Sequence, residues 1–72
     1  MSGRPVKRSL SLKGHRTSVS LEDEFWHAFR EIARAQGRAI NDLAAEIDAS
    51  RSSETGLASA IRVFVLRHYR GS

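Results

Sequence analysis

The stretch His15-Arg-Thr-Ser-Val-Ser-Leu21 decides the fold of this chain. Apolar and polar residues alternate along it, which is the period of a strand with one buried face. Val19 and Leu21 fall on the side expected to be buried, and the opposite side carries Arg16, Ser18 and Ser20. A single strand leaves its backbone hydrogen-bonding groups without partners. We therefore expect it to pair with the same strand of a second chain, in a homodimer.

A second alternating segment, Ser9-Leu-Ser-Leu12, precedes this strand, but its apolar residues fall on even numbers instead of odd ones. A hairpin turning at Lys13-Gly14 would place Leu10 opposite Thr17 on one face. A bulge at Gly14 would also reconcile the two faces. The sequence leaves both alternatives open. We detect no internal repeat and no low-complexity tract.

Helical patterns follow the strand. Glu22-Asp-Glu24 supplies acids where a helix N-terminus favours negative charge, and apolar residues then recur at helical spacing. With Gly37 as a C-terminal stop, the first helix is predicted from about Asp23 to Gln36.

A second, shorter helix is expected to begin at Asn41, which is a favourable N-cap residue. Residues 50–56 have the composition of a loop. A third apolar stripe then predicts a C-terminal helix at about residues 57–69.

The length of 72 residues allows one small domain, and a domain this small is marginal without a staple or a partner subunit. There is no cysteine, and His15, His27 and His68 lie in separate segments, so we expect no disulfide, metal or other cofactor. No apolar run is long enough for a membrane span or a secretory signal, which predicts a cytoplasmic protein.

Positive charge is concentrated at the N-terminus. Residues 1–16 contain five Lys or Arg and no acid, whereas residues 17–72 contain seven Arg and eight acids. We divide the chain into a basic arm at residues 1–14, with an optional strand at residues 9–12, and a domain at residues 15–72. Residues 1–8 are expected to lack regular structure. A basic arm is typical of proteins that bind nucleic acid, although it also occurs as a solvated tail.

Three motifs in this order resemble the ribbon-helix-helix family of Arc-, MetJ- and CopG-type DNA-binding domains. They are Arg16-Thr-Ser-Val-Ser-Leu21, Phe25-Trp26-x-x-Phe29-x-x-Ile32-Ala33 and Gly37-Arg-Ala-Ile-Asn-Asp-Leu43. The sequence from His15 to Arg70 is also similar to the sequences of a bacterial subgroup known only as ribbon-helix-helix domain proteins. The resemblance implies a mainly α fold with one N-terminal strand that pairs across a homodimer, two core helices and an additional C-terminal helix. That last helix either extends the dimer core or is the true second helix, with residues 41–56 as an insertion.

The resemblance also implies a mechanism, in which an antiparallel ribbon enters the major groove of double-stranded DNA. The implied base contacts are Arg16, Ser18 and Ser20. The N-terminus of the second helix would hold a phosphate, although Ala39 stands where relatives often have a hydroxyl. The expected phosphate contacts are Arg38, Asn41, Arg4, Lys7, Arg8 and Lys13. The expected dimer core is Val19, Leu21, Trp26, Phe29, Ile32, Leu43 and Ile47.

The leading functional hypothesis is a dimeric, sequence-specific transcriptional regulator, and most simply a repressor. The alternative is a protein-interaction module, such as an antitoxin-like protein that binds a partner through its C-terminal helix. We find no nucleophile–base arrangement, phosphate-binding loop or pair of acids typical of an enzyme active site. A four-stranded ribbon would fit poorly into a major groove about 12 Å wide, so a hairpin at residues 9–21 would count against direct base reading.

Overall fold

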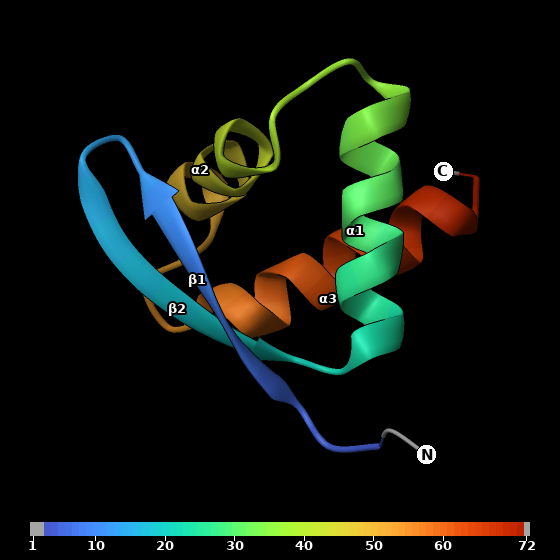
Figure 1. Cartoon of the computed structure of the whole chain (residues 1–72), viewed down its shortest axis with the longest axis horizontal. Coiled ribbons are helices and arrows are strands. Elements are labelled where there is room, and N and C mark those ends of the chain that lie inside the picture. Colours follow the sequence, from blue (N-terminus) through green and yellow to red (C-terminus); the bar gives the residue numbers. More distant parts are fainter. Residues whose placement is uncertain (1–2, 72) are drawn as a thin grey trace.

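The computed structural model describes residues 3–71, which form two strands followed by three helices. The elements are β1 (Val6–Leu12), β2 (His15–Leu21), α1 (Asp23–Ala35), α2 (Ile40–Ser50) and α3 (Leu57–Tyr69). Figure 1 shows the hairpin on one side of the molecule and α1 on the other, with α3 running from the hairpin past α1. Residues 1 and 2 of the expected arm, and residue 72, lie outside the described residues.

The two strands pair with each other in one antiparallel sheet, and Leu10 lies opposite Thr17. Of the two alternatives for this region, the hairpin is therefore correct. Lys13 and Gly14 both have positive φ angles, 50° and 91°, as the two central residues of a type I′ turn do. The expectation of one strand per chain is wrong, because the segment before Gly14 has the length and alternation to be the partner of β2. Residues 6–8, expected to lack regular structure, belong to β1.

One face of the hairpin covers the helices. Leu10 and Leu12 of β1 and Val19 and Leu21 of β2 are buried, and they join one apolar core with residues of all three helices. Every residue predicted for the dimer core is buried within a single chain: Val19, Leu21, Trp26, Phe29, Ile32, Leu43 and Ile47. A single chain thus buries the apolar faces that we had assigned to a dimer core.

In the turn between α1 and α2, the end of α1 agrees with the expectation from the sequence, whereas the start of α2 differs from it. Gly37 has a φ of 67°, and the Arg38 amide donates to the Ala33 carbonyl at 2.9 Å, which is a Schellman-type helix end. The expected N-cap is wrong: α2 begins at Ile40, its N-cap position is Ala39, and no side chain caps it. Asn41 is free for another contact because α2 begins one residue earlier.

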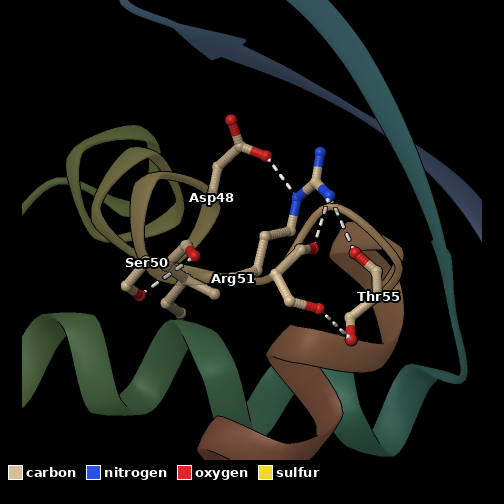
Figure 2. A network of polar contacts seen from close by, with 6 residues as sticks. Asp48, Ser50, Arg51 and Thr55 are labelled. Carbon is tan, nitrogen blue, oxygen red and sulfur yellow. Dashed lines mark hydrogen bonds and ion pairs between the residues drawn. The ribbon is translucent and has the colours of Figure 1, made fainter.

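The third helix extends the core, which decides between the two alternatives for this segment. Ile61 and Val65 of α3 are buried against the other elements, and α2 is itself a regular helix of the core and not an insertion. The connection between these helices is ordered by Arg51, which donates to Asp48 at 2.7 Å and to the Thr55 carbonyl at 2.8 Å. Figure 2 shows this guanidinium bridging the end of α2 and the loop. Among residues 3–71, no helix has the length and apolar character needed to cross a membrane.

Candidate nucleic-acid interface

The face of the hairpin that points away from the helices is polar and basic. Its exposed side chains alternate with the buried ones, and they are Lys7, Ser9, Ser11, Arg16, Ser18 and Ser20. The register pairs Lys7 with Ser20, Ser9 with Ser18, and Ser11 with Arg16 across the two strands. We call these six residues the ribbon face. It carries two cations, four hydroxyls and no carboxylate.

The structure brings the predicted base contacts together with two serines for which no contact was predicted. Arg16, Ser18 and Ser20 lie side by side on β2, as alternation along one strand requires. Ser9 and Ser11 of β1 complete the face, and we had assigned them no contact. The available signal was the parity of Ser9 and Ser11 in a hairpin that turns at Lys13-Gly14.

The two strands are also similar in sequence and form a short, imperfect repeat, in which three of the seven aligned residues are identical. Val6-Lys-Arg-Ser-Leu-Ser-Leu12 aligns without a gap with His15-Arg-Thr-Ser-Val-Ser-Leu21 at an offset of nine residues. The outward pattern is Lys/Arg-x-Ser-x-Ser in both strands. The order of exposed and buried positions is also the same in the two strands.

The predicted phosphate contacts are divided between different places. Lys7 belongs to the ribbon face, and Arg4 and Lys13 are exposed before β1 and at the turn. Arg8 instead faces the helices: its guanidinium is 3.0 Å from the Asp23 carboxylate and stacks over the Trp26 ring at 5.2 Å. This arrangement counts against Arg8 as a phosphate contact, because it lies on the same side of β1 as Leu10.

The remaining two predicted phosphate contacts lie near the start of α2. Arg38 forms an ion pair with Glu46, which competes with any anion for its guanidinium. The Asn41 Oδ1 accepts a hydrogen bond from the Ser11 backbone amide at 3.2 Å. Asn41 therefore connects α2 to the outer edge of β1.

The outer edge of β2 is held in a comparable way by α3. The Arg62 guanidinium donates to the Ser20 carbonyl at 3.2 Å and to the Glu22 carboxylate at 3.0 Å, and it stacks over the Phe25 ring at 5.8 Å. Unpaired strand edges are sites at which another strand can add, and side chains placed against them oppose such addition. Each outer edge of this hairpin has one such side chain.

Arg62 also affects the ionisation of Glu22 at the corner between β2 and α1. A hydrogen bond from its own backbone amide, and then the hydrogen bond from Arg62, hold the pKa of the Glu22 carboxyl below its usual value of 4.5. A carboxyl whose pKa is lower in the folded state stabilises the fold above its unfolded pKa. That contribution is lost as the pH falls through the folded pKa.

We therefore expect the free energy of unfolding to decrease as the pH is lowered below about 4.5, in part through Glu22. Glu22→Gln should remove this part of the pH dependence and leave a shallower profile. Denaturant titrations at a series of pH values measure the effect. Glu54→Gln, on the exposed loop, is the matched control and should retain the wild-type slope. An unchanged slope in Glu22→Gln would show that Glu22 is not linked to folding.

A second group of basic residues lies on α1, away from the hairpin. His27, Arg30 and Arg34 line a hollow of about 390 Å³, together with Glu31 and Arg38. Unlike the ribbon face, this hollow includes a carboxylate. The Tyr69 hydroxyl lies 3.5 Å from the same Glu31 carboxylate.

The chain matches a known protein family. Residues 5–69 match the protein family described as "Ribbon-helix-helix domain". The matched region includes both strands of the hairpin and all three helices. No significant match to the chain was found among curated proteins or among solved structures.

Proposed function

The chain belongs to the ribbon-helix-helix domain family, which matches nearly its whole length, and from this we propose that it is a DNA-binding regulator whose ribbon face contacts the major groove of duplex DNA. The family points to DNA as the partner in general terms. The contacts, the sequence specificity and the regulatory role are part of our proposal.

One observation carries the proposal: the ribbon face presents two cations and four hydroxyls on an exposed surface with no carboxylate. Two antiparallel strands are within the width that a major groove accepts. The hairpin is two-stranded, and its helices all lie behind the buried face. A hairpin would widen the ribbon to four strands only where two hairpins join edge to edge.

Within this face we assign base contacts to Arg16, Ser18 and Ser20. An arginine can donate two hydrogen bonds to the O6 and N7 acceptors of guanine, and a serine can donate to or accept from several bases. Arg4 and Lys13 lie at either end of the hairpin, where they would contact phosphates without reading bases. Arg38 and Asn41 are retained as phosphate contacts only where DNA displaces their present partners.

The test is to compare Arg16→Ala with wild type on a selected duplex and on random duplex DNA. Loss of a bidentate guanine contact costs roughly 1–3 kcal/mol, so binding to the selected duplex should weaken roughly 5- to 150-fold. Binding to random DNA should weaken only a few-fold, and the salt dependence should flatten by at most about one phosphate contact. Fluorescence anisotropy at two salt concentrations measures both quantities.

Arg67→Ala is the matched control, since it removes the same charge from an exposed position of α3. It should leave discrimination between the two duplexes unchanged. Equal losses on both duplexes in Arg16→Ala would assign Arg16 to the phosphates. If the wild-type protein binds no duplex even at low salt, the proposed function is wrong.

The homodimer remains part of the proposal, because members of the ribbon-helix-helix family typically bind DNA as dimers. β2 already has a partner in its own chain, so a dimer is not required to satisfy its backbone. A dimer of this chain would bring together two hairpins, each with its own ribbon face. Sedimentation would give about twice the chain mass of 8.0 kDa for a dimer and this mass for a monomer.

A second candidate function, binding of a protein partner through α3, is favoured by one observation. Val63, Leu66 and Tyr69 are exposed on this helix at intervals of three residues. Leu66→Glu distinguishes the two functions, because it alters this stripe and leaves the ribbon face intact. DNA binding that survives Leu66→Glu supports the ribbon face, and a protein that never binds DNA favours the partner-binding function.

A further inference from the structure

The repeat of β1 in β2 has a geometric consequence for the ribbon face. Each register pair joins residues whose numbers sum to 27, as in Lys7 with Ser20 and Ser9 with Ser18. Adding nine to a β1 residue gives its counterpart in β2, so the pair Lys7–Ser20 maps onto the pair Arg16–Ser11. The pair Ser9–Ser18 maps onto itself. A local pseudo-twofold axis therefore passes between Ser9 and Ser18, perpendicular to the hairpin.

The contacts at the edges of the hairpin follow the same relation. Ser11 and Ser20 are counterparts in the two strands, and each has a backbone group held by a helix side chain. Asn41 of α2 accepts from the Ser11 amide, and Arg62 of α3 donates to the Ser20 carbonyl. The hairpin is thus contacted at equivalent places by two different helices, and each contact occupies one backbone group on an outer strand edge.

We propose that one chain of this protein carries a complete, pseudo-twofold ribbon that recognises a short inverted repeat in duplex DNA, with Lys7 reading one half and Arg16 the other. This inference rests on the proposed function and adds to it the symmetry of the target. It also gives new roles to three residues of β1. Lys7, expected above to contact phosphates, takes the role of Arg16. Ser9 and Ser11 take the roles of Ser18 and Ser20.

The spacing of the two cations sets the scale of the target. Lys7 and Arg16 lie at opposite ends of the ribbon face, four register steps apart. At about 3.4 Å per strand residue, this is roughly 14 Å along the ribbon. Base pairs follow each other at about 3.4 Å, so the two contacts would fall roughly four base-pair steps apart. The Ser9–Ser18 pair would lie over the centre of the inverted repeat.

The first experiment tests the single-chain ribbon without DNA. The chain has no cysteine, and Ser9–Ser18 is a non-hydrogen-bonded pair, as its position relative to the two-residue turn requires. Such pairs have Cα atoms about 4.5 Å apart, which permits a disulfide. The double variant Ser9→Cys/Ser18→Cys should oxidise to a disulfide within one chain. The single variant Ser18→Cys should stay monomeric on a non-reducing gel, whereas rapid formation of a disulfide-linked dimer would place two β2 strands together and overturn the proposal.

The second experiment tests the symmetry of recognition by selecting preferred duplexes from a random pool. The wild-type protein should select an inverted repeat, Lys7→Ala should relax one half of it, and Arg16→Ala the other. Lys7→Arg should make the preferences of the two halves alike. A motif that only Arg16→Ala relaxes, with Lys7→Ala weakening all sequences equally, overturns the inference and leaves the proposed function standing. Absence of any duplex binding overturns both.

Discussion

Replacing Phe29 with alanine is expected to have the largest effect on stability of any single change in this chain. The Phe29 ring is fully buried, with the Trp26 ring at 6.4 Å and the Phe64 ring at 6.2 Å. Truncating such a ring costs about 3–5 kcal/mol. A domain of this size has a total stability of roughly 4–11 kcal/mol. The midpoint of thermal unfolding should fall by more than about 12 °C.

Trp26 is the only tryptophan of the chain, so its fluorescence reports unfolding directly. Tyr69→Ala is the matched control, because Tyr69 is aromatic but 58% exposed at the end of α3. Its melting curve should remain close to that of the wild type. A Phe29→Ala protein that melts with the wild type would contradict the packing of α1 against α3 and the hairpin.

The largest effect on DNA binding is expected from Ser18→Glu. Ser18 lies at the centre of the ribbon face, and the substitution places a carboxylate there, against the bases and phosphates of the groove. Like charges brought together at an interface cost several kcal/mol. Affinity for both selected and random duplexes should therefore fall by about 100-fold or more.

Ser59→Glu is the matched control for this change in charge. Ser59 is exposed in the first turn of α3, where a negative charge suits the helix dipole and does not touch the hairpin. Its DNA affinity should change by only a few-fold, through the net charge of the chain. Circular dichroism shows whether either variant alters the fold. Equal losses in the two variants would mean that the charge of the whole protein, and not the ribbon face, governs binding.

The sequence was sufficient to predict those features that follow from a local period. Alternation along residues 15–21 predicted β2 and the residues on each of its faces, and helical spacing predicted three helices. The Schellman-type end at Gly37 also follows from local preference, since glycine adopts a positive φ without strain. The family resemblance is confirmed by the match over residues 5–69.

Features that depend on contacts between distant segments were not predicted. Arg8 counted as one more charge of a basic arm, whereas its position in β1 places it against Asp23 and Trp26. Asn41 is a residue type favoured at helix N-caps, but α2 begins one residue before it and its side chain contacts the Ser11 backbone. The contact of Arg62 with Ser20 joins residues 42 positions apart and leaves no local pattern.

The repeat between the two strands was present in the sequence but was not found. Only Ser9, Ser11 and Leu12 are identical to their counterparts, and Lys7 and Leu10 match by residue class. Over seven residues this similarity is slight. It gains meaning from the antiparallel register, which places equivalent residues about one axis.

Titration of the isotopically labelled protein with a selected duplex, followed by backbone amide chemical shifts, tests the central claim most directly. If the ribbon face binds DNA, the largest shifts should fall on both strands, between Lys7 and Ser11 and between Arg16 and Ser20. The amides of His27, Arg30 and Arg34, in the basic group on α1, should move little. Shifts concentrated on α1 or α3, with the hairpin unaffected, would contradict the account.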